Sequence, residues 1–296
     1  MGKIGAVINK ASGTLSPEEA KKRLEEVKEQ LGSIVSPECL SVVSGDQIKQ
    51  EIERLKKQGI DTLIAGGGDG TISAAAELVA DTPITLVVAA LGTRNHFARD
   101  LGIPDDPVEA IRLVHKMNVK QVDLGEVNGH VFINNATIGL YPEIVEKREE
   151  TMKRGWKKGA AHIAAALKVL WWMPHMRLSV KSEKQQDYQL IPFLFVGNNE
   201  YEGKVITDSK RSSLNEGKLW LCKPRMPGKW PLLQMSWQLV LGGFRGAENL
   251  ETHLVNSLSV DSRKHIVKVA IDGENHNLAS PLQFTVRRKN LRVVVP

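Results

Sequence analysis

The sequence predicts an amino-terminal α/β domain with a mainly parallel sheet, followed by a carboxyl-terminal antiparallel β-sandwich decorated by helices. Over residues 1–122, apolar strand-like runs alternate with amphipathic helical stretches, which is typical of a helix-covered parallel sheet. Over residues 123–287, short strand-like runs separated by turn signals predominate. The 296 residues also exceed the roughly 100 to 200 residues of one ordinary domain, so two domains are expected.

The first strand and helix are predicted by an apolar run and a helix start signal. Residues 4–8 are apolar, and Ser16 and Pro17 then supply an N-cap and a first-turn proline. An apolar stripe at helical spacing follows, formed by Ala20, Leu24, Val27 and Leu31. This stripe is expected to pack on the sheet.

The alternation continues to residue 117. A second helix carries Ile48, Ile52 and Leu55 and ends at Gly59. Buried strands are predicted at residues 62–65 and 84–89, and helices after residue 71, after residue 95 and from Asp106 through Met117.

Turn chemistry and short apolar runs organise the second half. Asn128-Gly129, between residues 122–127 and 130–133, is a strong hairpin signal. Further strands are predicted at residues 176–180, 190–196, 217–222, 253–260 and 266–271. Helices are predicted at residues 141–152, 160–172 and 230–241.

Charge and cysteine content narrow the functional classes. Lys and Arg outnumber Asp and Glu by 40 to 34, a net charge of +6, which favours anionic partners such as nucleic acid, anionic lipid or phosphorylated ligands. Cys39 and Cys222 are too few for a disulfide framework and lack zinc-site spacing, so a cytoplasmic protein is expected. The uncharged stretch 230–244 is shorter than the roughly 20 residues that span a bilayer.

A glycine-rich turn follows the strand predicted at residues 62–65. Consecutive glycines let backbone N–H groups approach a phosphate, with a helix amino terminus behind them. The turn matches neither the Walker A pattern nor the Rossmann pattern, and a tight strand-to-helix turn is the alternative interpretation. Its residues are Gly66, Gly67, Gly68, Asp69, Gly70 and Thr71.

This turn resembles the GGDGT loop of diacylglycerol kinases, sphingosine kinases and related bacterial lipid kinases and, more distantly, of NAD kinases. Five further segments resemble motifs of that superfamily in the same order. Residues 92–99 resemble the Gly-Thr-x-Asn-Asp-Phe-Ala-Arg motif of the lipid kinase branch, which is the best discriminator within the superfamily. The others are residues 9–13, Ser41 with residues 45–46, residues 215–217 and residues 272–274.

The resemblance implies an architecture and a set of ATP contacts. It implies a nucleotide domain at residues 1–122, completed by residues 288–296, a lipid-substrate and metal domain at residues 123–287, and ATP in the cleft between them. Asp69 would orient Mg²⁺ or the triphosphate. The residues expected to bind ATP are Asn9, Ser12, Gly13, Ser41, Gly66, Gly67, Gly68, Gly70, Thr71, Thr93 and Asn95.

Phosphoryl transfer to an alcohol also needs a carboxylate to accept the proton. The resemblance implies that Asp272 is this general base, with Glu274 as the second choice. The alternative is that Asp272-Gly273 is merely a hairpin turn after the strand that ends at Ile271. The resemblance also implies a structural Mg²⁺ held by Glu216 and by oxygens of Ser213 and Lys218, against which a solvated turn is the alternative.

The acceptor is expected to be a lipid at a membrane surface. A basic stretch between Lys147 and Lys158 precedes an apolar helix ending in Trp171 and Trp172, which suits peripheral binding to anionic lipid. Core packing is the competing interpretation of that helix. Nucleic acid is not expected, because no aromatic-and-basic recognition motif accompanies the charge. A homodimer is left open.

Four positions depart from the resemblance: Lys10 and Ala90 stand where the superfamily has proline, and His96 and Glu216 stand where it has aspartate. His96 changes the local charge and bears on acceptor choice. The leading interpretation is an ATP-dependent, Mg²⁺-dependent kinase of a diacylglycerol-like or sphingoid-like hydroxyl. An NAD kinase-like enzyme and a catalytically retired nucleotide- or lipid-binding regulator are the alternatives.

Overall fold

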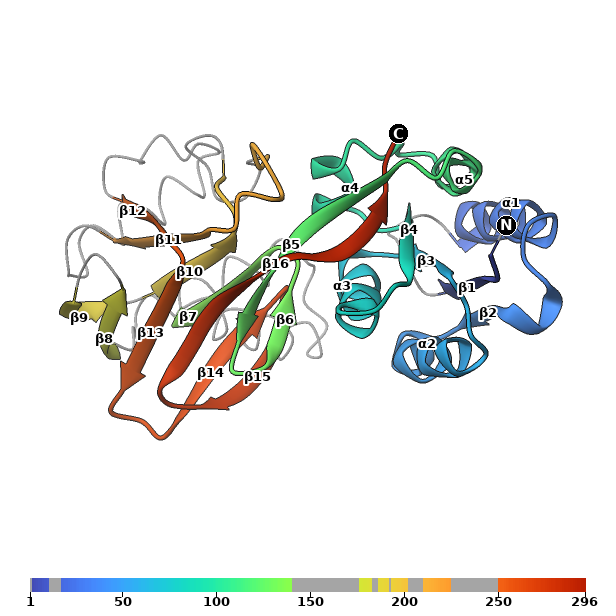
Figure 1. Ribbon diagram of the computed structural model, residues 1–296. Coiled ribbons are helices and arrows are strands. Elements are labelled where there is room, and N and C mark those ends of the chain that lie inside the picture. Colours follow the sequence, from blue (N-terminus) through green and yellow to red (C-terminus); the bar gives the residue numbers. More distant parts are fainter. Residues whose placement is uncertain are drawn as a thin grey trace. The chain divides into compact units, whose positions relative to one another are not determined.

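The computed structural model describes residues 2–10, 17–139, 176–182, 186–191, 193–201, 210–224 and 250–296 (Figure 1). The predicted helices at 141–152, 160–172 and 230–241 lie outside these residues. The chain divides into two compact units. Unit 1 holds Met1–Leu124, Ser213–Glu216 and Arg287–Pro296, and unit 2 holds Gly125–Ser212 and Gly217–Val286.

Unit 1 is built on a parallel sheet with strand order β2-β1-β3-β4, which continues into the end of β16. Every residue of β3 and β4 is buried, because helices cover both faces of the sheet. The parallel, helix-covered architecture predicted from the sequence is confirmed. The strands are β1 Ile4–Asn9, β2 Leu40–Val43, β3 Thr62–Gly67, β4 Thr85–Ala90 and β16 Leu282–Val294.

The helices of unit 1 pack in pairs, α1 with α5 and α2 with α3, and Figure 1 shows the two pairs on opposite faces of the sheet. The helix predicted through Met117 ends instead at Arg112 and continues as a 3₁₀ turn over Leu113–His115. Met117 adopts a positive φ of 45°, which stops a right-handed helix. The helices are α1 Pro17–Gly32, α2 Ile48–Lys57, α3 Asp69–Val79, α4 His96–Asp100 and α5 Pro107–Arg112.

Unit 2 is an antiparallel sandwich, which confirms the second half of the predicted fold class. One layer is a six-stranded sheet with order β12-β11-β10-β7-β14-β15. The other layer contains β8, β9, β13, the first part of β16 and the hairpin β5–β6. The remaining strand bounds are β5 Val119–Val127, β6 His130–Phe132, β7 Asn135–Gly139, β8 Met176–Ser182, β9 Gln186–Ile191, β10 Phe193–Asn198, β11 Leu219–Pro224, β12 Leu250–Val255, β13 Ser257–Ser262, β14 Ile266–Ile271 and β15 Glu274–Ala279.

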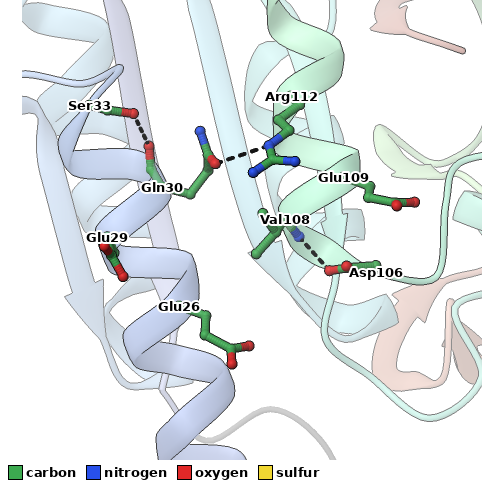
Figure 2. A pocket seen from close by; sticks show the side chains of 8 residues that line it. All are labelled: Glu26, Glu29, Gln30, Ser33, Asp106, Val108, Glu109 and Arg112. Atoms are coloured by element: carbon green, nitrogen blue, oxygen red, sulfur yellow. Dashed lines mark hydrogen bonds between the residues drawn. The ribbon is translucent and has the colours of Figure 1, made fainter.

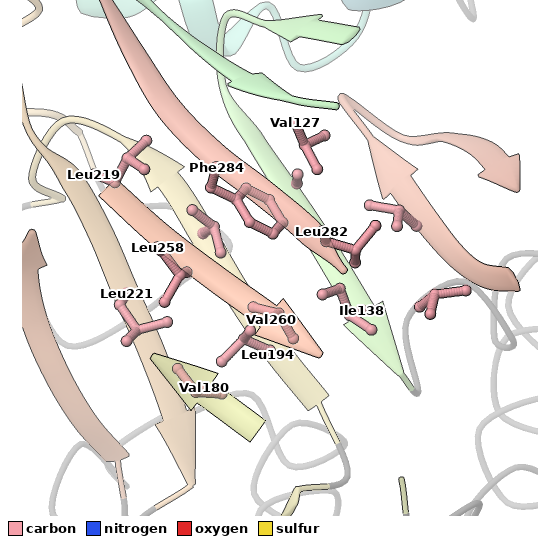
Figure 3. Packing of buried hydrophobic residues seen from close by; sticks show 14 of the residues in the cluster. Val127, Ile138, Val180, Leu194, Leu219, Leu221, Leu258, Val260, Leu282 and Phe284 are labelled. Atoms are coloured by element: carbon pink, nitrogen blue, oxygen red, sulfur yellow. The ribbon is translucent and has the colours of Figure 1, made fainter. Parts of the chain in front are cut away.

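The core of unit 2 is an apolar cluster contributed by both layers (Figure 3). Ile138, Leu194 and Leu221 come from the six-stranded sheet, and Leu258 and Phe284 come from the opposite layer. Alternate residues of each strand enter the cluster, as the period-2 geometry of a strand requires. The cluster therefore holds both layers together around one shared core.

Each of two predicted strands is divided into two separate strands in the structure. The run 190–196 contains the end of β9 at Ile191 and the start of β10 at Phe193; Pro192 between them cannot donate to a strand ladder. The run 253–260 is divided at Asn256 into β12 and β13. The hairpin predicted at Asn128-Gly129 is confirmed, because Val127 pairs with His130 and both turn residues have positive φ.

Strand β16 belongs to both units. Its residues up to Thr285 pair antiparallel with β13 in unit 2, and Arg292 and Val293 pair parallel with β4 in unit 1. In unit 1 the Asp81 carboxylate accepts a hydrogen bond from Arg287 at 2.8 Å and another from Asn290. Among the described residues, no helix is both long and apolar enough to span a bilayer.

Candidate functional site

The parallel strands of unit 1 end at one edge of the sheet. Asn9 is level with Val43, Ile8 with Gly66 and Gly67 with Ala90. Strand β2 lies on one side of β1, whereas β3 and β4 lie on the other, so the direction in which strands are added across the sheet reverses between β1 and β3. Ligands of such sheets bind outside the carboxyl ends of the strands at this switch point.

Two glycine-containing loops meet at this edge. A Cβ added to Gly92 would lie 2.7 Å from the Cα of Gly68, and one added to Gly67 would lie 2.4 Å from the Thr71 side chain. Gly92 therefore leaves room for the two loops to approach, and Gly67 leaves room for Thr71 of its own segment. The Asn9 side chain donates a hydrogen bond of 3.1 Å to the Thr71 hydroxyl. The structure thus brings together the predicted ATP residues Asn9, Gly67, Gly68 and Thr71.

Asp69 connects the loop after β3 to the loop after β4. Its carboxylate accepts the backbone N–H of Asn95 at 3.1 Å and that of His96 at 2.9 Å. Asn95 has a positive φ of 50° and donates from its side chain to the Gly92 carbonyl at 3.0 Å. The contacts observed for Asp69 are thus with backbone N–H groups, and they fix the loop that carries exposed Thr93.

The edge has properties that suit a nucleotide. The loops leave no room for side chains at Gly67 and Gly92, and backbone approach of this kind is what phosphate binding uses. The Oδ1 atom of Asn95 is buried without a hydrogen-bond partner, and such an atom can accept a donor from a ligand. The residues present therefore fit ATP. Ser12 and Gly13 lie outside the described residues.

Ser41 is not brought to this edge. Its buried hydroxyl donates to the Glu51 carboxylate at 2.7 Å and accepts from Arg54 at 2.9 Å. These contacts join β2 to α2. The hydrogen bonds from Ser41 and Arg54 hold the pKa of Glu51 below its ordinary value near 4.5.

The Ser41→Ala variant is therefore expected to lose stability and to keep its nucleotide affinity. The free energy of unfolding at pH 7 should fall by about 1 kcal/mol, since the Glu51 and Arg54 bonds lose their partner. A lowered pKa stabilises the fold above the unfolded value and loses that contribution as pH falls through the folded pKa. Urea unfolding should thus show a weaker acid-side decline in the variant. Unchanged stability together with weakened ATP binding would return Ser41 to the nucleotide site.

A pocket of about 610 Å³ lies between α1 and α5, away from the strand ends (Figure 2). Four carboxylates line it, and its one cation, Arg112, donates to Gln30 at 3.1 Å. Such a charge balance repels phosphate. This pocket is therefore a poor candidate for a nucleotide site. The eight lining residues are Glu26, Glu29, Gln30, Ser33, Asp106, Val108, Glu109 and Arg112.

In unit 2, Asp272 and Gly273 form the two-residue turn between β14 and β15. Ile271 pairs with Glu274, and both turn residues have positive φ, as this hairpin type requires. The Asp272 carboxylate accepts three backbone N–H groups at 2.9, 2.9 and 3.1 Å, those of Ile133, Asn134 and Asn135 respectively. Glu274 is exposed at the start of β15. The hairpin turn that was the alternative interpretation of Asp272-Gly273 is therefore present. Its Asp272 carboxylate also binds the backbone N–H groups of residues 133–135.

A buried polar network lies behind the same loop, and the sequence did not reveal it. Arg211 donates to the Ile133 carbonyl and, at 3.0 Å, to the Asn134 side chain. The Tyr201 hydroxyl donates to the Asn134 carbonyl at 2.9 Å, and the Asn198 side chain donates to the Ile133 carbonyl at 3.1 Å. Arg211 and Asn198 are buried. Their wide separation in sequence from residue 133 gives no periodic signal that could have found them.

The three residues predicted to bind a metal differ in their contacts. The Ser213 hydroxyl donates to the Asn215 side chain at 2.8 Å, the Lys218 carbonyl accepts the Asn199 N–H at 2.9 Å, and Glu216 is exposed. The candidate metal ligands are oxygen atoms, one of them from a carboxylate, and oxygen ligands are those that magnesium prefers. Within the described ranges, His, Cys, Asp and Glu side chains do not gather in groups of three that could hold a metal.

The amino-terminal part of the chain is similar to a known family. Residues 3–127 match the model of the diacylglycerol kinase catalytic domain, so the resemblance read from the sequence is confirmed for this part. Proteins named "Probable lipid kinase YegS-like" from Pseudomonas aeruginosa PAO1 and Pseudomonas fluorescens Pf-5 are 39% and 41% identical over 118 and 111 residues. These matches cover 39% and 37% of this chain, and only 38% and 36% of the relatives' lengths.

Solved structures share the fold over the whole chain. Two chains from Bacillus anthracis str. Sterne, the second named as a diacylglycerol kinase, superpose with TM-scores of 0.73 and 0.68 at 20% and 18% identity. Each comparison covers 100% of this chain and 97% of the other. Yeast NADH kinase superposes with a TM-score of 0.54 at 12% identity, covering 84% of that chain. The predicted fold class is confirmed.

Proposed function

We propose that this chain, whose residues 3–127 match the diacylglycerol kinase catalytic domain, is an ATP-dependent lipid kinase. It transfers the γ-phosphoryl group of ATP to a hydroxyl of a diacylglycerol-like or sphingoid-like acceptor. The observation that carries the proposal is the meeting of the Gly68 and Gly92 loops at the carboxyl ends of β3 and β4, beside the switch point between β1 and β3.

Unit 1 would hold ATP. Backbone N–H groups from Gly67 to Thr71 approach the phosphates, with the amino terminus of α3 behind them. Asp69 keeps the second loop in place through Asn95 and His96, so Thr93 and Asn95 reach the nucleotide. Preorganised loops of this kind contribute most of the rate in phosphoryl transfer, because positioning and charge stabilisation are the main tasks.

Unit 2 would supply the proton acceptor. The acceptor oxygen forms a bond to the γ-phosphorus, the bond from that phosphorus to the β–γ bridging oxygen breaks, and ADP leaves. The hydroxyl proton passes to a carboxylate of the Asp272–Glu274 hairpin. The three N–H contacts of Asp272 support a role in holding the hairpin, so we assign the proton to the exposed carboxylate of Glu274.

Mg²⁺ and the membrane belong to the same proposal. Glu216, with oxygens of Ser213 and Lys218, would hold a structural magnesium ion, and Asp69 would orient a second magnesium ion or the triphosphate. Magnesium, when bound with ATP, neutralises phosphate charge. The chain would act on the cytoplasmic side of a membrane surface, bound peripherally through anionic lipid. The basic stretch from Lys147 to Lys158 supports this, although it lies outside the described residues.

An acceptor panel tests the proposal. Purified protein is incubated with magnesium, γ-labelled ATP and mixed micelles that carry diacylglycerol, sphingosine, ceramide or phosphatidylglycerol, with NAD in a separate arm. Label in one organic-extractable product is the expected result. Label in NAD alone would replace the proposal by an NAD kinase, and ATP binding without transfer to any acceptor would contradict kinase activity toward these lipids.

A further inference from the structure

The loop at residues 133–135 is bound from both sides. On one side, its three backbone N–H groups donate to the Asp272 carboxylate at 2.9 to 3.1 Å. On the other, Arg211 donates to the Ile133 carbonyl and to the Asn134 side chain. Arg211 is 3% exposed. The loop therefore lies between a buried cation and a carboxylate.

We propose that Arg211 is a positioning residue for phosphoryl transfer, which acts on the Asp272–Glu274 hairpin through the 133–135 loop. This inference rests on the proposed function. Among the described contacts, Arg211 binds the Ile133 carbonyl and the Asn134 side chain, and the same loop binds Asp272, so the loop connects Arg211 to the hairpin. Sequence motifs give it no role, and the geometry alone connects it to the hairpin.

The chemistry of the peptide groups explains the coupling. A peptide group that accepts from a cation through its carbonyl becomes a stronger donor through its N–H, because hydrogen bonds in a chain polarise one another. The Ile133 carbonyl takes Arg211, and the amide of the same peptide unit, the Asn134 N–H, donates to Asp272 at 2.9 Å. Arg211 thus strengthens and orients a bond that fixes the carboxylate.

The contacts of Arg211 restrict which side chains could replace it. Its guanidinium carbon lies 5.6 Å from the centre of the Tyr201 ring, within range of a cation–π contact. Tyr201 in turn donates to the Asn134 carbonyl at 2.9 Å. A shorter or unbranched side chain at position 211 cannot reach two acceptors with a planar fork. The loop, and with it the Asp272 turn, would then have more than one arrangement.

The main experiment compares Arg211→Gln with the wild type. Arg263→Gln serves as the matched control, because Arg263 is an exposed arginine in the same unit. We expect Arg211→Gln to lower kcat by about 100-fold, the effect of misplacing a reacting group by about 1 Å, with the KM for ATP unchanged. Hydrogen exchange measured by mass spectrometry should accelerate in peptides that cover residues 131–137. The control should change neither.

Two further variants separate positioning from folding. Tyr201→Phe removes one hydroxyl from the same loop and should lower kcat by about fivefold, the value of one hydrogen bond. In the double variant Arg211→Gln, Asp272→Asn, the loss in kcat should not exceed that of Asp272→Asn alone, because both changes act through one loop. Losses that multiply, or a folded Arg211→Gln with normal kcat, would overturn the proposal.

The exchange measurement distinguishes this inference from the proposed function. If the wild type phosphorylates no acceptor, the kinase assignment fails, yet exchange at residues 131–137 still decides whether Arg211 holds the loop. If the wild type is active and exchange in Arg211→Gln is unchanged, the kinase assignment stands and the positioning role is refuted.

Discussion

Glu274→Gln is expected to lower kcat for phosphoryl transfer by about 10²- to 10⁴-fold, the usual contribution of a general base, without destabilising the fold. Glutamine has the shape of glutamate but cannot accept the acceptor's proton. The side chain is exposed at the start of β15, so its replacement leaves no buried group unpaired. Thermal unfolding should match that of the wild type.

The Asp272→Asn variant is expected to differ from Glu274→Gln, because it should lower stability as well as activity. An asparagine would place an NH₂ group against backbone N–H groups that now donate to a carboxylate. Leaving a buried donor unpaired costs roughly 1 to 3 kcal/mol, so both activity and stability should fall. Asn277→Gln, an exposed change on the same strand, is the control for each. Full activity in Glu274→Gln with loss of activity in Asp272→Asn at normal stability would return the base role to Asp272.

Gly92→Ala is expected to produce the second large effect, a fall of about 100-fold in kcat/KM for ATP. The new methyl group would lie 2.7 Å from the Gly68 Cα, and a backbone atom cannot rotate away as a side-chain end can. One loop must therefore move, at a cost of about 1 to 3 kcal/mol in stability. Steady-state kinetics measure kcat/KM, calorimetric titration with ATP measures the affinity, and thermal unfolding measures the loss of stability.

Gly32→Ala is the matched control, because a methyl group there meets nothing within 4 Å. The Gly68→Ala variant distinguishes the effect of loop packing on stability from the effect of space for phosphate on ATP affinity. Its Cβ would lie 3.5 Å from Gly92, an ordinary contact, so stability should hold while ATP affinity drops. Wild-type ATP affinity in a folded Gly92→Ala variant would show that the nucleotide does not use this edge.

The fold class and the hairpin at Asn128-Gly129 follow from local sequence patterns, whereas the end of α5 at Arg112 and the division of two predicted strands do not. The apolar spacing of Ile48, Ile52 and Leu55 predicts α2, and apolar runs predict the buried strands β3 and β4, because burial on a regular element repeats with the geometry of that element. Asn128-Gly129 fixes a hairpin, because few residues accept positive φ. The glycine turn and the segment after Gly92 also indicated kinase chemistry through their resemblance to known loops.

Contacts between segments that are distant in sequence determine which of the predicted site residues lie together. Ser41 has a motif-like position, yet its hydroxyl is committed to Glu51 and Arg54. Arg211 has no motif, yet it supports the loop that holds Asp272. Hydrogen-bond partners are chosen by proximity in space, and the register of strands far apart in the chain sets that proximity. Local sequence patterns carry information about the period and turns of one segment, whereas the partners of a buried polar group depend on all the segments that pack around it.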